Sequence, residues 1–465
     1  MHSPMSCELS ILKTPMEAQL MTSDSAPPIE RKTILMIATR DLRGRMTGRK
    51  AVLRTTSDSL VGLGHRVLVA HFGDAQHNIR DEEANLNSRI QYFSLMGPRP
   101  WELVRQFVLE FLPGRKSLNE CLYASKRAEK ALRRIVHAEN VEIVITDMIR
   151  TVGYGELLNL PWIADLDDLL SLRYRRIAKE RRGLDGLLGY HKAPVLRALS
   201  WFIRPAARII LDKEATILER REITVARQAN VTLTVSSAEA MALSKASLRP
   251  VSATPFCVQG PDHIAPLKTR VRHLVFLGGM SYQPNRNAVQ MFDKQILGQL
   301  RSSGIHDITL DVIGEGEESI RREFSPNVRF VGYVEDLDHE LQKYKAMLVP
   351  ELLQGGIKTK IVHAALNGVV VLAHDSAIEG MGLERDINVL TWYSPQELAA
   401  LLRRIQGTDS TLDRIAENAL RWATVTFGVK QAEAKWKAHL ESLNESCPKT
   451  SKGIEMKATE LSRAS

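Results

Sequence analysis

The chain contains two separate runs in which short apolar segments alternate with longer amphipathic segments. The first run begins at Thr33–Ala38 (TILMIA) and the second at His273–Gly279 (HLVFLGG). Short apolar segments bounded by polar residues are typical of strands buried in a parallel sheet, and the amphipathic segments are typical of the helices that cover it. A link rich in helix and strand breakers, Leu248–His263 with three Pro and one Gly, separates the two runs. We therefore predict an α/β protein with two doubly wound, Rossmann-like lobes.

The boundaries follow from these runs and from two polar ends. The predicted strands are Thr33–Ala38, Arg66–Ala70, Val141–Ile145, Pro161–Asp165, Val231–Val235, His273–Gly279, Ile308–Gly316, Asn327–Val334, Ala346–Pro350 and Val369–His374. The predicted helices include Lys50–Leu63, Leu118–Glu139, Arg208–Ala229 and the closing stretch Asp413–Leu443. The resulting division is a tail at 1–31, a first lobe at 32–265, a second lobe at 266–425, a closing helix at 426–445 and a tail at 446–465.

In open parallel sheets, ligands bind at the carboxyl ends of the strands. The most informative such loop is Pro350–Met381, which reads as a strand end, the Gly355-Gly356 turn, a short helix that ends at Gly368, and a strand. Two glycines at a helix start let the backbone approach a ligand closely, and free N–H groups there favour an anion. This pattern predicts a phosphate-binding helix start.

Two lysines strengthen this interpretation, because Lys358 and Lys360 fall in the first turn of that helix. Cations there oppose the helix dipole by about 0.3–1 kcal/mol each, so their presence makes sense if an anion occupies the site. His363 follows Lys360 by three residues and is expected on the same face. The alternative is that both lysines are solvated surface residues.

Three further loops of the second lobe contribute candidates. Phe276–Phe292 joins a strand to a helix through Gly278-Gly279, so Gly279, Ser281 and Asn285 are candidate donor-binding residues, with Asn285 or a neighbour as the helix cap. Glu315 stands between two glycines at a strand end, where a plain turn carboxylate is the alternative, and Tyr333 is placed to meet a nucleobase. The chain has no GxxxxGK[ST] and no GxGxxG motif.

The first lobe offers carboxylates at two strand ends. Asp165 and Asp168 in IADLDDLL, and Asp147 in ITDMIRT, are candidate catalytic residues that bind or activate an acceptor hydroxyl. The alternative is that Asp167 or Asp168 caps the helix that follows. Arg150 is a second candidate on this side, and no metal site is predicted.

The formal net charge of +9 points to an anionic partner. The segment Arg173–Arg208 holds ten Lys/Arg and two Asp/Glu, interleaved with Leu, Trp, Phe and Tyr, which suits an anionic membrane surface. A solvated basic helix pair is the alternative, and no nucleic-acid-binding motif is present. Arg45, Arg49 and Lys50 in GRMTGRK are candidates to touch donor phosphates or an anionic acceptor.

Nothing in the sequence predicts export or a membrane span. The first residues lack the apolar core of a signal peptide, and no apolar stretch of about 18 residues occurs. The four cysteines (Cys7, Cys121, Cys257, Cys447) are scattered, which fits a reducing compartment. The expected location is the cytoplasm, with peripheral contact to the inner face of the plasma membrane as a further expectation.

Taken together, the loops FLGGMSYQPNRNAV, LDVIGEGEE, VRFVGYVEDL and GGIKTKIVHAALNGVVVLA resemble the C-terminal lobe of GT-B glycosyltransferases of group 1 (GT4-like), especially bacterial exopolysaccharide-type sugar transferases. The likeness is best over Leu274–Met381. It implies a GT-B fold, a nucleotide-sugar donor, retention of configuration, no cofactor and an acceptor that is often lipid-linked.

The resemblance also implies roles for individual residues. Lys358 and Lys360 would hold the diphosphate, with Gly279 and Ser281 on its other side and Tyr333 beside the base. The family carries a Glu-x7-Glu pair in the donor site, and here Gly355 and His363 stand at those positions, with His363 near the ribose.

Two hypotheses remain open at this point. The first is a glycosyltransferase that moves a sugar from a nucleotide sugar to a lipid-linked or saccharide acceptor without a metal. The second is a non-catalytic GT-B homologue that acts as a binding or membrane-associated protein. A GT-B epimerase is a third, weaker reading, because it would have no use for a membrane-facing acceptor side. The sequence says nothing of the oligomeric state.

Overall fold

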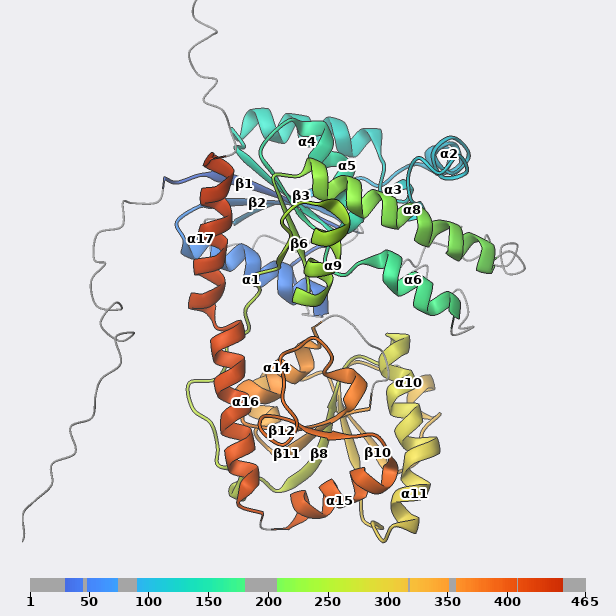
Figure 1. Cartoon of the computed structure of the whole chain (residues 1–465), viewed down its shortest axis with the longest axis vertical. Helices are drawn as coiled ribbons and strands as arrows, with labels where there is room; N and C mark the ends of the chain where they lie inside the picture. Colours follow the sequence, from blue (N-terminus) through green and yellow to red (C-terminus); the bar gives the residue numbers. More distant parts are fainter. Residues whose placement is uncertain are drawn as a thin grey trace, which may run out of the picture. The chain divides into compact units, whose positions relative to one another are not determined.

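The structure is a computed structural model of the whole chain, and it describes residues 30–44, 48–73, 90–179, 207–316, 318–350, 357–407 and 409–445. The part of the chain from Lys32 onward forms one compact unit. Within it the strands form two separate parallel sheets, one from each predicted lobe (Figure 1).

The sheet of the first lobe has seven strands in the order β3-β2-β1-β4-β5-β6-β7. All of its pairings are parallel, and β1 lies between β2 and β4 with Leu35 opposite Leu68 and Val144. The strands are β1 (Thr33–Ala38), β2 (Arg66–Phe72), β3 (Ile90–Leu95), β4 (Ile143–Asp147), β5 (Trp162–Asp165), β6 (Val231–Thr234) and β7 (Ser252–Ala253).

Helices cover both faces of this sheet, because successive residues of each buried strand point to opposite sides. Leu35 and Ile37 of β1 pack into one core with residues of α4, α5, α6 and α8, whereas Ile34 and Met36 pack into another core with α1 and α17. The helices are α1 (Gly48–Gly62), α2 (Pro100–Gln106) with the π-helical turn η2 (Phe107–Phe111), α3 (Leu118–Cys121), α4 (Lys126–Ala138), α5 (Met148–Leu158), α6 (Leu170–Lys179), α8 (Ala207–Gln228) and α9 (Ser237–Ser247).

The second sheet repeats this plan with six strands in the order β10-β9-β8-β11-β12-β13. Its pairings are also parallel, and β8 lies between β9 and β11. The strands are β8 (Arg272–Leu277), β9 (Leu310–Ile313), β10 (Val328–Gly332), β11 (Tyr344–Val349), β12 (Val370–His374) and β13 (Leu390–Trp392).

The second sheet is again covered on both faces. Leu274 and Phe276 of β8 pack with α10, α11 and α15, and Val275 packs on the other side with α14 and α16. The helical elements are η5 (Leu267–Thr269), α10 (Gln283–Met291), η6 (Phe292–Ile296), α11 (Leu297–Ser302), α12 (Glu318–Arg321), α13 (Leu337–Leu341), α14 (Thr359–Leu366), η7 (Asp375–Ala377) and α15 (Pro395–Gln406), followed by α16 (Thr411–Phe427) and α17 (Val429–Glu445).

The last helix returns to the first lobe. Helix α17 packs against α1, and its Trp436 is fully buried in the core beneath β1 and β2. The indole N–H of Trp436 donates to the carbonyl oxygen of Pro255 at 2.7 Å. This contact joins the C-terminal helix to the segment that links the two sheets.

The predicted α/β class with two doubly wound lobes is confirmed. Three strands were not predicted: β3, with six residues, and the shorter β7 and β13. The helix predicted over Leu118–Glu139 is instead two helices, because Ser117 caps α3 and Ser125 caps α4. The cap predicted at Asn285 is wrong: α10 begins at Gln283 after Tyr282, and no side chain caps it.

Candidate functional site

The strand order of the second sheet defines where a ligand would bind. The chain winds one way from β8 to β9 and β10, and the other way to β11 and β12. The connections therefore leave the sheet on opposite faces between β8 and β11, which opens a crevice at the carboxyl ends of these strands. The loop Gly278-Gly279 and the start of α10 flank this point on one side, and the start of α14 flanks it on the other.

Three glycine-containing loops meet at this edge through their backbones. Gly278 N–H donates to Ile313 at 2.8 Å, Met280 N–H to Glu315 at 2.6 Å, and Gly314 N–H to Gly332 at 2.8 Å. At Gly314 a Cβ would lie 2.4 Å from the carbonyl oxygen of Gly278, and φ is +144°. Only glycine fits this approach without moving the backbone.

Lys360 connects the two flanking helices. Its Nζ donates to Oδ1 of Asn285 at 3.0 Å and lies 4.2 Å from the ring centroid of Phe276. A hydrogen bond and the face of an aromatic ring together hold an ammonium group in one place. The structure therefore places a positive charge at the switch point of the sheet.

Asn285 holds the loop as well as the lysine. Its amide nitrogen donates to the carbonyl oxygen of Gly279 at 3.0 Å, while its oxygen accepts from Lys360. One side chain thus ties the Gly278-Gly279 loop to the start of α14. This is a different role from the predicted cap.

The remaining predicted donor-side residues fall around this point. Lys358 occupies the N-cap position of α14, while Ser281 and Glu315 are exposed and Tyr333 is about half exposed. His363 is partly buried in α14, and burial lowers its pKa despite the opposing charge of Asp338. The imidazole is therefore neutral near pH 7. Gly355 and Gly356 lie outside the described residues.

The first lobe has its own switch point, between β1 and β4, and here the side chains pair with one another. Arg49, at the start of α1, lies 3.0 Å from Asp147, 2.7 Å from Asp165 and 3.3 Å from Asp167. Its side chain is only 6% exposed. Four ionisable groups from three segments of the chain are therefore joined in one buried network.

The two predicted acids of this network respond differently to burial. Burial opposes ionisation of Asp147, but Arg49 and Arg40, together with hydrogen bonds from Thr39, outweigh it and lower its pKa. For Asp165, burial raises the pKa and the nearby charge of Asp167 adds to it, although Arg49 opposes. Both carboxyl groups pair with Arg49. Arg49, which was predicted to touch a donor phosphate or an anionic acceptor, therefore binds these acids in the structure.

Asp168 stands apart from the network. Its Oδ2 pairs with Arg173 of α6, and its Oδ1 accepts no hydrogen bond from another described residue although it is buried. Burial and then the charge of Asp167 raise its pKa, while Arg173 lowers it. Among the three predicted catalytic acids, Asp168 alone has a buried oxygen that accepts no hydrogen bond from another described residue.

The other predicted basic residues have partners in this structure. Arg150 donates to Asn119 at 2.9 Å and lies over the ring of Tyr123, and Lys50 donates to the carbonyl oxygen of Arg43. Arg45 and residues 180–206 of the basic segment lie outside the described residues.

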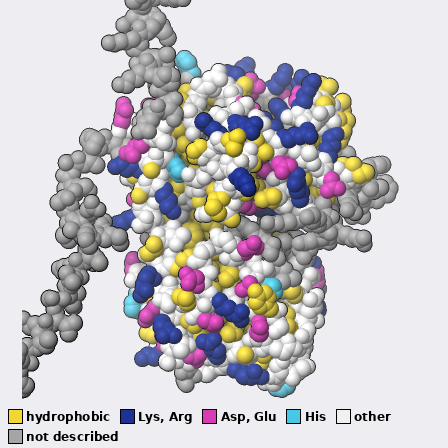
Figure 2. Space-filling model, viewed as in Figure 1, with side chains coloured by type: hydrophobic (Ala, Val, Ile, Leu, Met, Phe, Trp, Pro, Cys, Tyr) yellow, Lys and Arg dark blue, Asp and Glu magenta, His cyan; other side chains and the backbone are white. Residues whose placement is uncertain are grey.

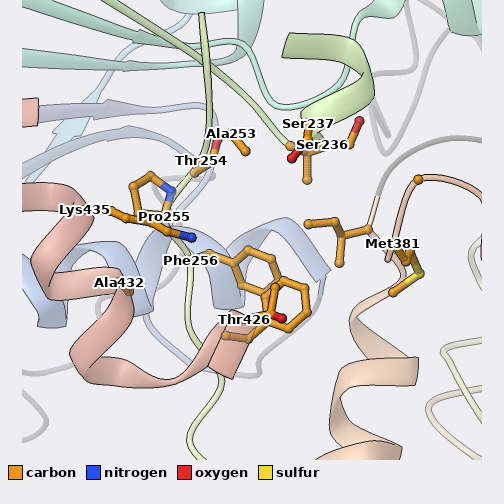
Figure 3. A pocket seen from close by; sticks show the side chains of 14 residues that line it. Ser236, Ser237, Ala253, Thr254, Pro255, Phe256, Met381, Thr426, Ala432 and Lys435 are labelled. Carbon is orange, nitrogen blue, oxygen red and sulfur yellow. The ribbon is translucent and has the colours of Figure 1, made fainter. Parts of the chain in front are cut away.

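A small cavity lies where the chain crosses between the lobes (Figure 3). It has a volume of about 100 Å³, and its walls include Ser236 and Thr254 of the first lobe and Met381 of the second. Ligand pockets usually measure about 300–1,000 Å³, so this cavity is too small for a nucleotide sugar. It belongs to the junction between the lobes and does not contain Lys360 or Asn285.

Sequence reasoning missed several residues that organise these edges. Phe276 was predicted only as part of a strand, and Thr39 was not singled out. Both lie at the carboxyl end of a strand, β8 and β1 respectively, where ligands bind in open parallel sheets. Arg173 was counted only within a charged segment. The pairing of Arg49 with three acids has no local signal, because Arg49 and Asp147 are 98 residues apart.

Comparison with solved structures identifies the fold as GT-B. Anabaena HepE, crystallised with UDP, is 15% identical with a TM-score of 0.56, and the match covers 88% of this chain and 100% of that chain. Sucrose-phosphate synthase from Thermosynechococcus elongatus is 13% identical with a TM-score of 0.58, over 90% and 100% of the two chains. WaaG, a glycosyltransferase involved in lipopolysaccharide biosynthesis, is 12% identical with a TM-score of 0.54, over 87% and 98%.

A family comparison shows a similarity that is confined to the second lobe. Residues 271–406 match the model of the family described as glycosyl transferases group 1. No curated protein matches this chain in sequence. The matched residues include β8 to β13, Lys360 and the glycine loops at the carboxyl edge of the second sheet.

Proposed function

We propose that this protein is a glycosyltransferase that takes a sugar from a nucleotide-sugar donor bound at the switch point of the second sheet. The observation that carries this proposal is the Lys360 ammonium, held by Asn285 and Phe276 between the starts of α10 and α14. The family match over 271–406 covers this point. HepE binds UDP and UDP-glucose in its crystal structures, so UDP sugars are the first donors to test.

The chemistry that such a site supports is electrostatic. Breaking the bond between sugar and diphosphate leaves negative charge on the departing diphosphate. Lys360 and the N–H groups at the start of α14 stabilise that charge, and they do so without a metal. Neutral His363 offers a donor or acceptor for a ribose hydroxyl rather than a second charge. Lys358, Gly279, Ser281 and Tyr333 complete the proposed donor set.

On the acceptor side we assign Asp168 the contact with the acceptor hydroxyl. Its Oδ1 is buried without a partner among the described residues, and a raised pKa suits a group that takes up a proton. Asp147 and Asp165 then act indirectly, because they and Arg49 hold the loops around Asp168 in place. The acceptor class we propose is a lipid-linked or free saccharide.

Retention of configuration, metal independence and a site of action at the cytoplasmic face of a membrane are parts of the same proposal. None of the described helices is long and apolar enough to cross a membrane. Activity that persists in EDTA, and a product whose anomeric configuration matches the donor by NMR, are the expected results.

The direct test is calorimetric titration with UDP and GDP, followed by transfer and hydrolysis assays with a panel of nucleotide sugars. Lys360→Gln is expected to weaken nucleotide binding at least about tenfold, since a hydrogen bond to a charged group contributes about 1.5–3 kcal/mol. Asp168→Asn should leave nucleotide binding unchanged and reduce transfer. Wild-type protein that binds no nucleotide would refute the proposal.

A second candidate function is a non-catalytic GT-B protein that binds a partner or a membrane. The observation that favours it is the full pairing of Asp147 and Asp165 with Arg49, together with a neutral His363 where the family has a carboxylate. Nucleotide binding without transfer to any saccharide or lipid-linked acceptor would decide for this function.

A further inference from the structure

An apolar stripe on the first lobe has no partner in the described structure. Six of the sixteen large apolar side chains that are exposed in the described residues fall between Met96 and Leu112. Five of them follow one side of α2 and η2, namely Trp101, Val104, Val108, Leu109 and Leu112. Contiguous exposed apolar surface of this kind marks an interaction site in a folded protein.

The opposite side of the same helix is firmly anchored. Glu102 is buried and accepts from the backbone N–H of Arg99 at 2.7 Å. Phe107 and Phe111 stack with their centroids 5.2 Å apart and pack against Ile217 of α8. The inner face of this helix therefore packs against the first lobe, while the apolar side chains on its outer face remain exposed.

Basic residues surround the stripe. Arg99, Arg105 and Arg115 are exposed. The acidic residues of this helix contribute less to the surface, because Glu102 is buried and Glu110 is partly buried. The surface that accompanies the apolar stripe is therefore positively charged.

The end of the helix is tied to α8, which extends the same surface. Lys213 of α8 donates from Nζ to the carbonyl oxygen of Leu112 at 2.6 Å and lies over the ring of Phe111. Ile209, one turn earlier in α8, is 72% exposed beside Ile210, which packs on this cluster. Figure 2 shows hydrophobic and basic side chains next to each other on the part of the first lobe where Figure 1 places α2.

We propose that α2 and η2 dock on an anionic lipid surface, with the Trp101–Leu112 stripe in the interface and the arginines at the headgroups. A helix with one apolar face, an exposed Trp and flanking Arg residues is suited to lie in the plane of a membrane. A symmetric pair of protein copies fits less well, because the same basic rim would face itself across the two-fold axis.

This surface is separate from the donor site and from the basic segment predicted to meet a membrane. It contains none of the residues of the second lobe; α2 and η2 end at Phe111, well before Arg173, and the part on α8 begins at Ile209, directly after the basic segment. The proposal therefore stands or falls independently of the glycosyltransferase activity.

The test is co-sedimentation of the full chain with vesicles of phosphatidylcholine alone or with phosphatidylglycerol added. The main variant combines Trp101→Gln, Val104→Gln and Leu109→Gln, and we expect it to lose at least about tenfold in partitioning into the mixed vesicles, because three interfacial apolar groups are removed. The matched control is Val425→Gln on α16, since Val425 and Val104 are 64% and 65% exposed. Arg105→Gln should weaken binding about fivefold, and salt should weaken it further.

Circular dichroism and melting of each variant check that the fold is kept, which the exposure of all three residues leads us to expect. Equal sedimentation of wild type and triple variant overturns the proposal, as does an equal loss in the Val425→Gln control. Wild-type dimers that the triple variant abolishes, with vesicle binding unchanged, would assign the stripe to a second copy of the chain and also overturn it. Selective loss in the triple variant, larger with phosphatidylglycerol present, supports it.

Discussion

The two lobes share one architecture but differ in what stands at the carboxyl edge of their sheets. In the second lobe, the edge consists of backbone from three glycine loops and a lysine held by an amide and an aromatic ring. In the first lobe, the edge consists of Arg49 enclosed by three aspartates. The second-lobe edge therefore presents backbone and lysine donors, whereas the first-lobe edge pairs its charged side chains with one another.

This difference indicates how work is divided between the lobes. A phosphate needs N–H groups and a cation that are not already committed to a carboxylate. In the second lobe, the Lys360 ammonium donates to the neutral amide of Asn285 and lies over the ring of Phe276. The first lobe uses its charges to hold loops together, and beside them Asp168 Oδ1 is buried without a hydrogen bond from another described residue.

The largest effect is expected at the buried network. Arg49→Met leaves three carboxylates without their common partner in a buried place, and should lower the free energy of unfolding by about 3–5 kcal/mol. Urea denaturation measures it. Arg54→Met on the same helix is the control, because its pair with Asp58 is more exposed and should contribute less than about 1 kcal/mol. An Arg49→Met protein as stable as the control would show that the first lobe does not depend on this network.

The second lobe should instead be most sensitive in its backbone. Gly314→Ala sets a Cβ 2.4 Å from the oxygen of Gly278 at a positive φ, and should destabilise the protein by about 1–3 kcal/mol while weakening nucleotide binding. The control is Gly298→Ala in α11, where a Cβ meets nothing within 4 Å and alanine should be neutral or stabilising. Thermal melting of both variants with and without UDP measures the change in stability and the change in UDP binding. Unchanged UDP binding in Gly314→Ala would show that the donor site does not depend on the close backbone contact between Gly314 and Gly278.

A pH experiment sharpens the contrast on the first-lobe side. Burial raises the pKa of Glu222 to about 8, against hydrogen bonds from Ser171 that lower it. The folded protein therefore keeps a proton that the unfolded chain releases above about pH 4.5, and stability falls as the pH rises from there to about 8. Glu222→Gln removes this loss and should be more stable than wild type by about 1–2 kcal/mol at pH 8, with little difference near pH 4.

The control for this experiment is Glu219→Gln on the same helix. Glu219 is about half exposed and pairs with Arg175, so its replacement should change the free energy of unfolding by less than about 1 kcal/mol. Denaturation curves recorded between about pH 4 and pH 9 measure both variants. Parallel slopes for Glu222→Gln and wild type would show that Glu222 does not hold the proton.

The smallest effect is expected at Asn285. Asn285→Ala removes the hydrogen bonds to Lys360 and Gly279 but keeps the lysine, and should weaken UDP binding about threefold to tenfold, with little change in stability. Asn287→Ala is the control, since this asparagine of the same helix is exposed and contacts only Gln283 among the described hydrogen bonds. Equal affinities of the two variants would mean that Lys360 does not need its amide partner.

The order of elements was predictable because it depends on local patterns. Thr33–Ala38 is a strand with the bounds predicted, and α8 differs from its prediction by one residue at each end. The missed strands β7 and β13 have two and three residues, which is too short for a pattern. The break between α3 and α4 depends on two serine caps inside a helical pattern, where the local signal is ambiguous.

The candidate site divides in the same way. The glycines at strand ends and the lysines at a helix start are short-range signals, and they are sufficient to indicate Lys360 and Gly279 from the sequence alone. The partner of Lys360 was not predictable, because Asn285 precedes it by 75 residues. Asp147, Asp165 and Arg49 were each predicted to face a ligand, and no local pattern indicated that they would face one another.

The sequence by itself determined the class of fold, the number of lobes and the loops that meet at each sheet edge. These depend on the periodicity of apolar residues and on turn chemistry, which act over a few residues at a time. Only the tertiary structure decided which charges remain available to a ligand. That outcome depends on contacts between residues far apart in the chain, such as Arg49 with Asp147 and Lys360 with Asn285, because charge pairing is set by distance in space.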